Sequence, residues 1–547
     1  MLRPFLALVV LLSAVLPARP GVLAAVDETW RFTNAPAIPS NAAWTTPGFD
    51  DSGWAAAPSG FGSSAYGEQT PLSNPTGNWR TVLFRKPFVV TNAPGRGPLF
   101  LRIDWRDGLV AFLNGREVAR RGFQGPAGSA VPFDAIPTSR FSGLAEEIRI
   151  GPANDWILAG TNILAFQVHS ASEFDRPVLV PELVYDLLRE PSLQVSGSNQ
   201  MTLSWRPADA VPARVVLASD GLPDRSIEVP ANDSPSVVLD GLEPGKTYRY
   251  AVMAAPPGQP PVLVASSSFR ALPASGRARI AFLSDSGSGL ASQFAVARAL
   301  AREDADVVVH AGDVIYPGFS TGLADTRHFS VYRRQMARVP FMLAWGNHDL
   351  YFGTEPMRSI LRPPPNDTPA DAHKAAGTFP EAYYSFDVGP VHVAVVYQPV
   401  LSQYALVTNS PQFRWLDSDL ASSTRPWKVV VAHHPVATSG GHRFTDYNAN
   451  GRPDWEEFAE VLLPLTRKRG VQFFLSGHDH VFERFLPRDG LNIVLSGGGG
   501  TTLYFLRGFL PDSVQFAITH HHLRLTFDEA EADLRVILPD GSELDGF

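Results

Sequence analysis

The pattern of apolar and polar positions changes character about halfway along the chain. Up to about residue 273, short runs of strand-forming residues are separated by Gly, Pro and Asn, as at residues 99–105, 110–113 and 163–168. Asn114-Gly115 follows the second of these runs and is a strong signal for a hairpin turn. The first half of the chain is therefore predicted to be all β.

From about residue 277, apolar strands alternate with amphipathic helical stretches. The predicted strands are residues 280–283, 307–309, 341–344, 429–431 and 471–475, and the first predicted helices are residues 291–302 and 328–338. Such alternation is typical of a largely parallel sheet that helices cover on its faces. This second half is predicted to be an α/β domain.

Several domains are expected, because a single core seldom grows beyond ~250–300 residues and this chain has 547. Residues 271–276 suit a linker after a Pro- and Gly-rich loop. We place one β domain at residues 27–187, a second at 190–273, and the α/β domain with its C-terminal strands at 277–547.

Residues 1–25 are typical of a secretory signal peptide. Arg3 precedes an apolar run at residues 5–16, and Val22-Leu23-Ala24 resembles a cleavage site, with cleavage after Ala24 or Ala25. An anchoring transmembrane helix is the alternative, but the run is short and prolines follow it. We predict a secreted or periplasmic protein with no membrane association after cleavage.

Composition narrows the possible partners. The net charge is −8, the sequence pI is about 6.0, and the charges are dispersed, so no nucleic-acid partner is expected. The chain has no cysteine and hence no disulfides. Stability in an exported protein must then come from its cores and from bound metals.

Polar side chains follow five predicted strands of the α/β domain. Open α/β sheets build their sites at the carboxyl ends of strands, and one polar end could be a simple cap, but five in succession indicate chemistry. Thirteen of the fourteen histidines lie between His310 and His522, which supports this interpretation. The five segments are Ser284-Asp285-Ser286-Gly287, Gly312-Asp313-Val314-Ile315-Tyr316, Gly346-Asn347-His348-Asp349, His433-His434-Pro435 and Gly477-His478-Asp479-His480.

The mixture of carboxylate, amide, phenol and imidazole suits transition metals better than magnesium alone. A bridging carboxylate can hold two ions ~3.5–4 Å apart, the spacing used for in-line displacement at phosphorus. The five segments together resemble the calcineurin-like metallophosphoesterase superfamily. Within it, Asp285-Ser286-Gly287 with Tyr316 resembles the purple acid phosphatases, since most members carry a histidine where Gly287 stands and use no tyrosine.

This resemblance covers about residues 190–540 and implies a role for each matching residue. Asp313 would bridge two metals. The resemblance implies Asp285, Tyr316 and His480 as further ligands of an Fe(3+) ion, and Asn347, His433 and His478 as further ligands of a divalent ion (Fe, Zn or Mn). His434 would occupy the neighbouring place that does not bind metal.

The same resemblance implies the reaction. Metal-bound hydroxide would attack a small phosphomonoester directly, with no phosphoenzyme. His348 and His442 would contact the phosphate, His442 would protonate the leaving group, and Arg443 stands where some relatives have another histidine. The catalytic residues would thus be His348, His442 and Asp313. A phosphodiesterase with the same metals is the close alternative, and a surface- or glycan-binding protein with an inert phosphatase domain is the second.

The two β domains carry resemblances of their own. Trp30, Trp44, Phe84-Arg85-Lys86, Leu113-Asn114-Gly115 and residues 161–165 resemble galactose-binding-like jelly rolls, which implies either a carbohydrate or surface ligand or a spacer. Residues 242–250 resemble the end of a fibronectin type III domain, in which Trp205 would be a core residue. The predicted fold is two all-β domains, a jelly roll and a sandwich, followed by an α/β domain with a β-sheet sandwich core.

One loop fits a calcium-binding pattern. Residues 446–457 match D-x-[DN]-x-[DN]-G-x5-E at every specified position, with a helix predicted after them at 455–467. An Asx-rich surface turn uses the same residue types and is the alternative. The predicted oxygen donors for Ca(2+) are Asp446, Asn448, Asn450, Asp454, Glu457 and the carbonyl of Arg452.

Three further features of the sequence lie outside the phosphatase and calcium patterns. His310 and His392 fall within strands and are expected to be packed. His520-His521-His522 is either a metal tract or, as we favour, part of a C-terminal strand at 516–527 paired with 532–538. Residues 351–383, rich in Pro and Ala, are expected to border the pocket and shape substrate choice.

Overall fold

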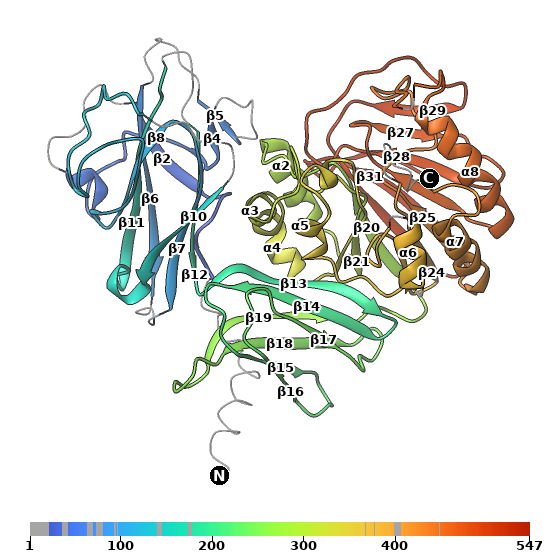
Figure 1. Ribbon diagram of the computed structural model, residues 1–547, viewed down its shortest axis with the longest axis horizontal. Helices are drawn as coiled ribbons and strands as arrows, with labels where there is room; N and C mark the ends of the chain where they lie inside the picture. Colours follow the sequence, from blue (N-terminus) through green and yellow to red (C-terminus); the bar gives the residue numbers. More distant parts are fainter. Residues whose placement is uncertain are drawn as a thin grey trace.

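The computed structural model describes residues 21–34, 42–62, 69–72, 80–91, 95, 97–138, 145–172, 178–366, 368–376, 378–398, 406–447 and 449–547. Most of the predicted signal peptide and Asn448 of the predicted calcium loop lie outside these residues. Figure 1 shows three regions: an N-terminal β region, a second β region below the centre, and a C-terminal α/β region.

The first β region contains two six-stranded sheets. One has the order β10-β7-β12-β4-β5 with β1 paired to β12, and the other has the order β3-β2-β6-β11-β8-β9. Trp30, Phe61, Phe84 and Phe166 are fully buried in the core that both sheets share. The strands are β1 (Val22–Ala24), β2 (Thr29–Thr33), β3 (Ala55–Pro58), β4 (Phe61–Gly62), β5 (Thr70–Pro71), β6 (Thr81–Val90), β7 (Pro98–Trp105), β8 (Gly108–Leu113), β9 (Arg116–Arg121), β10 (Glu146–Pro152), β11 (Gly160–His169) and β12 (Leu179–Tyr185), with short helical turns η1 (Ala42–Thr45) and η2 (Ala153–Asp155).

Two sequence predictions can be compared with this region. Asn114 and Gly115 join β8 to β9 with φ angles of 52° and 83°, so the predicted hairpin turn is confirmed. The predicted cleavage point lies directly after or next to β1, whose Ala24 is fully buried. Cleavage after Ala24 would therefore remove a strand that pairs with β12.

The second β region has a three-stranded and a four-stranded sheet. Their orders are β13-β14-β17 and β16-β15-β18-β19. Trp205 lies in their core, as expected, but that core is continuous with the core of the α/β region. Tyr250 donates a hydrogen bond to the Ala337 carbonyl at 3.0 Å across this contact. The strands are β13 (Leu187–Gly197), β14 (Gln200–Pro207), β15 (Ala213–Ala218), β16 (Arg225–Val229), β17 (Ser236–Leu239), β18 (Thr247–Ala254) and β19 (Val262–Arg270).

The α/β region is built on two mixed sheets that face each other across a shared apolar core. The first has the order β22-β21-β20-β30-β31-β32 and the second the order β23-β24-β25-β26-β28-β27-β29. Parallel pairing is confined to β20–β22 and to β24, β25, β26 and β28. The strands are β20 (Ala278–Leu283), β21 (Val307–His310), β22 (Phe341–Leu343), β23 (Tyr384–Val388), β24 (Val391–Val395), β25 (Trp427–Val431), β26 (Phe473–Ser476), β27 (Phe482–Phe485), β28 (Asn492–Ser496), β29 (Ser513–Ala517), β30 (His522–Phe527), β31 (Ala532–Ile537) and β32 (Glu543–Gly546).

Helices cover the outer face of each sheet. Residues of α2 and α4 join an apolar cluster on the outer face of the first sheet, and residues of α7 and α8 join one on the outer face of the second. Helix α8 contains the predicted helix at 455–467. The helices are α2 (Ala291–Leu300), α3 (Thr321–Ala324), the π-helical η3 (Asp325–Phe329), α4 (Ser330–Met336), η4 (His348–Leu350), α5 (Glu355–Arg358), α6 (Ala370–Ala376), α7 (Pro411–Ser422) and α8 (Asp454–Arg469).

The predicted single C-terminal strand at 516–527 is wrong. Strand β29 belongs to the second sheet and β30 to the first, so the chain crosses between the sheets at residues 518–521. The crossing is held by His521, whose backbone N–H donates to the Gly498 carbonyl and whose ring lies 2.8 Å from the Ser496 hydroxyl. Continuous strand-forming residues could not reveal which sheet each half joins.

A buried set of charges, here called the junction cluster, connects all three regions. Its members are Arg102, Glu147 and Glu182 of the first region, Arg189 and Arg206 of the second, and Asp325 of the third. The Asp325 carboxylate accepts a hydrogen bond from Arg189 at 2.5 Å and another from Arg206 at 2.7 Å. Three guanidinium groups and three carboxylates thus compensate one another at the place where the regions meet.

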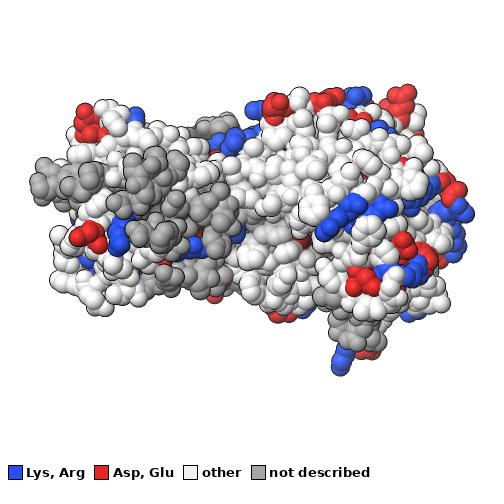
Figure 2. Space-filling model, turned by 90° about the horizontal axis from the view of Figure 1, so that it is seen from above, with Lys and Arg blue, Asp and Glu red and all other residues white. Residues whose placement is uncertain are grey.

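The surface adds two observations. Figure 2 shows acidic and basic side chains interspersed over the visible face, most of which is uncharged. Among the residues that the structure describes, no helix combines the length and the apolar character needed to cross a bilayer.

Candidate metal centre

The five predicted segments meet at one place. Strands β20, β21 and β22 of the first sheet and β25 and β26 of the second each end just before one of them. The site therefore lies where the carboxyl edges of the two facing sheets come together. The structure brings all seven predicted metal ligands to it: Asp285, Asp313, Tyr316, Asn347, His433, His478 and His480.

The Tyr316 hydroxyl has more hydrogen-bond acceptors around it than it has protons to donate. The oxygen lies 3.0 Å from Asp285 Oδ1, 2.9 Å from Asp313 Oδ2 and 3.0 Å from His480 Nε2. His480 Nδ1 lies 2.7 Å from the Thr502 carbonyl and donates to it, so in the neutral imidazole, the form that binds metal, Nε2 is an acceptor. One phenolic proton cannot serve three acceptors, so the donor set fits a cation.

A second group of donors shares Asp313. His433 Nδ1 donates to the Ala311 carbonyl at 2.8 Å, and its Nε2 faces Asn347 Oδ1 at 3.1 Å and Asp313 Oδ1 at 3.4 Å. His478 Nδ1 lies 3.0 Å from the same Asn347 oxygen. A ring nitrogen fixed by a carbonyl, with the other turned inward, is the usual arrangement of metal-binding histidines.

The backbone holds these groups in uncommon conformations. Asp285, Asp313 and His478 have φ angles of 58°, 50° and 71°, and strain of this kind is often found at functional sites. At Gly346 a Cβ atom would lie 2.2 Å from the Asp313 nitrogen, so only glycine allows this approach. At Gly287 a Cβ would lie 1.9 Å from the Val314 carbonyl oxygen, which excludes a histidine in this backbone.

Burial and neighbouring charges together shift the pKa values of the side chains in the site. Burial raises the pKa of Tyr316 and the charges of Asp285 and Asp313 raise it further, so the phenol keeps its proton unless a cation is present. Burial would also raise the pKa of Asp313, but the neighbouring His433 and His348 hold it below its usual range. The centre therefore favours positive charge next to Asp313.

Two of the three predicted substrate-binding residues lie beside the centre, and the third is bound elsewhere. The His348 ring lies 4.5 Å from that of Tyr316 at a tilt of 50°, and its Nδ1 lies 2.7 Å from the Pro317 carbonyl, which turns Nε2 toward Asp313. The His442 ring lies 4.2 Å from that of His478, with Nδ1 3.1 Å from the Thr445 hydroxyl. Arg443, by contrast, is bound to the Gly508 carbonyl.

Three functional side chains were not predicted. Asp349 accepts from the Val314 and Gly346 nitrogens at 3.0 and 2.9 Å and so fixes two ligand loops together. Asp479 accepts from the His442 nitrogen at 3.1 Å. Both follow a predicted ligand or substrate histidine directly in the sequence, which was the available signal. Tyr504 stacks on His480 at 3.8 Å and had no such signal.

The predicted calcium loop is held by its own hydrogen bonds. Asp446 accepts from the nitrogens of Asn450 and Gly451, and Asn450 Oδ1 accepts from the Arg452 nitrogen at 2.9 Å. Asp454 accepts from the Tyr447 nitrogen, and Asn450 donates to Glu457. These contacts are those of the Asx-rich turn that was the alternative, and Asn448 lies outside the described residues.

His310 and His392 are packed as expected. His310 lies 2.8 Å from the Ser286 hydroxyl beneath the centre, and His392 lies between Asp387 and Asp419, 2.8 Å from each. His521 contacts Ser496, whereas His522 contacts Glu303 at 3.0 Å. The last two rings have different partners and do not share a site.

Comparisons with known proteins agree with this geometry. Residues 278–482 match the calcineurin-like phosphoesterase family. The chain is 28% identical to acid phosphatase type 7 of Danio rerio over 33% of its own length and 42% of that protein, and 26% identical to the probable purple acid phosphatase 20 of Arabidopsis thaliana over 54% and 68%. A purple acid phosphatase from yellow lupin seeds has a similar fold, with a TM-score of 0.56, 17% identity and coverage of 85% of this chain and 92% of that one.

The C-terminal region is thus a calcineurin-like phosphoesterase domain, a class of hydrolases. Within this class the chain is similar to the purple acid phosphatases, so the family resemblance predicted from the sequence is confirmed. The chain spans 42% of the length of the zebrafish protein.

Proposed function

We propose that this protein hydrolyses small phosphomonoesters at two metal ions, Fe(3+) and a divalent ion, bound at the strand ends. The single observation that carries the proposal is the excess of inward-facing electron pairs around Tyr316 and Asn347. Asp285, Tyr316 and His480 would hold the ferric ion, Asn347, His433 and His478 the divalent ion, and Asp313 both. When bound, these ions neutralise the phosphate and activate a water molecule.

The residues around the centre would bind and orient the ester. His348 is placed to donate a hydrogen bond from Nε2 to a phosphate oxygen beside Asp313. His442, beside His478, would deliver a proton to the leaving alcohol. Arg443 would reach the phosphate only after leaving the Gly508 carbonyl, so we assign it a smaller part.

Hydrolysis of a chromogenic phosphomonoester and of its diester, from pH 4 to 9, tests the proposal. The wild type should prefer the monoester, with an acidic optimum, and should contain two metals. Asp313→Asn should lose at least about 1000-fold in turnover, or about 4 kcal/mol, because it removes the bridging carboxylate. Asp540→Asn, an exposed turn residue that bonds only Ser542 among the contacts described, is the control.

Other outcomes would change the assignment. A preference for the diester would keep the metal centre and favour a phosphodiesterase. Protein that contains both metals but turns over neither ester would instead support a binding protein with an inert domain. Loss of turnover in Asp313→Asn with both metals retained would contradict the bridging role.

The N-terminal regions have proposed roles of their own. We propose that residues 1–25 direct export and that the two β regions are a galactose-binding-like jelly roll and a fibronectin type III-like sandwich. Sequencing the N-terminus of exported protein tests the first point, and a start before Val22 would show that β1 is kept. A glycan array probed with the full chain tests whether the first β region binds a carbohydrate.

Calcium at residues 446–457 remains a separate proposal that rests on the sequence match. Calcium would have to replace the turn hydrogen bonds at Asp446 and Asn450. Adding a calcium chelator that spares the catalytic metals should then lower both melting temperature and turnover. Unchanged melting and turnover would leave the Asx-rich turn as the explanation of the motif.

A further inference from the structure

A cavity of about 350 Å³ lies beside the candidate metal centre. His442 and His478 line it on the side of the centre, and helix α8 lines it on the other side through Trp455 and Phe458. Since His442 is the group proposed to protonate the leaving alcohol, the cavity lies where that alcohol would emerge. Its size falls within the range of small-molecule sites.

His434 is the unusual residue of this cavity. Its side chain is buried, with 5% of its surface exposed, and neither ring nitrogen has a hydrogen-bond partner among the described residues. The backbone of Gln398 is close enough to affect its charge but lies outside hydrogen-bond geometry. Buried polar groups normally have a partner, and an exception often marks a place that a ligand or water completes.

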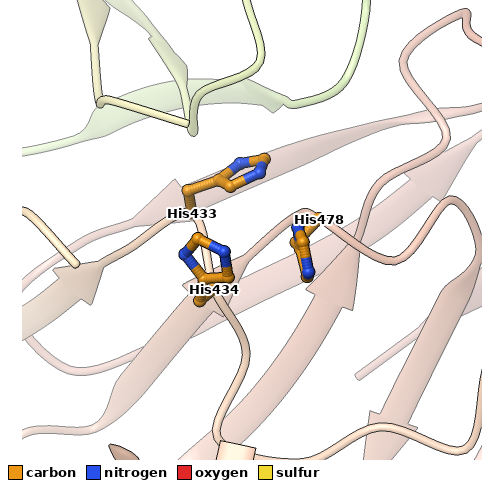
Figure 3. A group of neighbouring side chains, drawn as sticks. All are labelled: His433, His434 and His478. Atoms are coloured by element: carbon orange, nitrogen blue, oxygen red, sulfur yellow. The ribbon is translucent and has the colours of Figure 1, made fainter. Parts of the chain in front are cut away.

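The other histidines of the centre behave differently. His433, His480 and His348 each have one ring nitrogen at a backbone carbonyl, and that contact fixes which nitrogen faces the centre. His434 has no such contact, although its ring lies 4.2 Å from His478 and 5.0 Å from His433 (Figure 3). His478 also lacks a carbonyl contact, but its Nδ1 lies 3.0 Å from Asn347 Oδ1, whereas neither ring nitrogen of His434 has a partner among the described residues. We therefore assign His434 to the substrate and not to a metal.

The charge of the lining narrows the class of substrate. With the loop at 446–457 free of calcium, Asp454 and Glu457 contribute two carboxylates, whereas the third carboxylate, that of Glu460, is paired with Arg452 at 2.6 Å. A second phosphate or a carboxylate on the alcohol would be repelled. Trp455, Phe458 and Pro435 offer an apolar surface to the carbon skeleton.

We infer that the cavity binds the alcohol part of the ester and that this alcohol is an uncharged polyol or sugar. The ring nitrogens of His434 are covered in this conformation, so the ring turns toward the cavity and hydrogen-bonds one of the hydroxyl groups of the alcohol. The inference rests on the proposed phosphomonoesterase function and deepens it by naming the substrate class. His434 is a specificity residue here: it has one donor and one acceptor to offer and does not touch the reacting phosphorus.

The test compares two substrates that differ in hydroxyl groups. Glycerol 3-phosphate and propyl phosphate are given to the metal-loaded full chain, and kcat/KM is measured for wild type, His434→Phe and His434→Asn. The wild type should prefer the hydroxylated ester at least about tenfold, because a site built to bond a hydroxyl discriminates against the analogue that lacks it. His434→Phe should bring the ratio near one, mainly through KM, and His434→Asn should restore part of it.

Controls separate this role from others. His520→Phe makes the same exchange outside the cavity and should keep the wild-type ratio. Metal content is measured in parallel, and loss of a metal from both His434 variants would overturn the inference in favour of a metal ligand. An unchanged ratio in His434→Phe, or no preference in the wild type, would also overturn it.

The failure of this inference can be told apart from failure of the proposed function. Turnover of a chromogenic aryl phosphate by the wild type, without any preference for glycerol 3-phosphate, would leave the phosphomonoesterase intact and remove only the polyol pocket. If His434→Phe does not fold, the ratio in His434→Asn decides the matter. It should fall between the wild-type value and one.

Discussion

The junction cluster and the candidate metal centre both bury charged and polar side chains, but they satisfy them differently. At the junction, Asp325 is surrounded by Arg189, Arg206 and, at 4.0 Å, Arg102, so the chain supplies its own counter-charges. At the centre, Asp313 and Asp285 face a phenol and the imidazole rings of His433 and His480, with no guanidinium or ammonium group among the contacts described. The chain completes the first cluster alone, whereas the second requires cations from outside.

The difference follows from what each cluster does. The ion network connects the three regions through paired charges of the chain itself, although Glu182 Oε1 has no hydrogen-bond partner among the described residues. Holding several metal-binding side chains close together on a strained backbone lowers the stability of the protein without metal. Metal binding offsets this loss. Removing a residue should therefore damage stability most at the junction and activity most at the centre.

The largest effect on stability is expected from breaking the junction. Asp325→Asn leaves Arg189 without its carboxylate and Arg206 with Glu147 alone, and should lower the free energy of unfolding by about 3–5 kcal/mol, as for other buried ion pairs that lose one partner. Urea unfolding measures it, with metal content unchanged. Glu228→Gln, which opens the exposed Arg214–Glu228 pair, is the control and should cost less than about 1 kcal/mol.

Removing one of the two metals should cost nearly as much in the wild type. A single ion at 1000 times its dissociation constant adds about 4 kcal/mol, which chelation abolishes. Calorimetry before and after chelation measures the change. Asp313→Asn should show little further loss on chelation, and an equal loss in both proteins would show that the stabilising ions bind elsewhere.

The third cluster of charges, His392 with Asp387 and Asp419, can be disrupted by a change of pH alone. His392 is mostly buried, which would lower its pKa, but its bonds to Asp387 and Asp419 raise the pKa to about 9. Because the folded pKa lies above the unfolded value of about 6.5, the contribution is complete below pH 6.5 and is lost as pH rises through 9. The comparison of urea unfolding at pH 6 and pH 10 should show a loss of about 1–3 kcal/mol.

His392→Gln serves as the matched variant for this prediction. It should be less stable than the wild type at pH 6 and nearly equal to it at pH 10, since the wild-type imidazole is then neutral. An equal gap at both pH values would mean that His392 contributes by packing and not by charge.

The smallest effect is expected at a neutral contact between regions. Tyr250→Phe removes the hydrogen bond to the Ala337 carbonyl and should cost about 0.5–1.5 kcal/mol without altering turnover. Equilibrium unfolding with a parallel phosphatase assay checks it. A cost similar to that of Asp325→Asn would show that the contact between the second β region and the α/β region depends on more than the charge cluster.

The sequence alone was enough to locate most of the centre. Each ligand follows an apolar strand, and the carboxyl ends of parallel strands meet, so Asp285, Asp313, Asn347, His433 and His478 could be grouped before any coordinates. The hairpin at Asn114-Gly115 was equally local, because its positive φ angles are a property of those two residues. Such features depend on neighbours in the chain.

Only the tertiary structure decided the rest. Whether β29 and β30 join one sheet or two, and whether a linker at 271–276 separates two cores, depends on which distant strands pair. The junction cluster draws Arg102, Arg189 and Asp325 from three regions, and no spacing in the sequence relates them. Likewise, the resemblance set His434 apart from the predicted ligand His433, but only the structure shows that its ring nitrogens have no partner among the described residues. Long-range contacts carry this information because side-chain satisfaction is a property of the packed molecule, not of the chain.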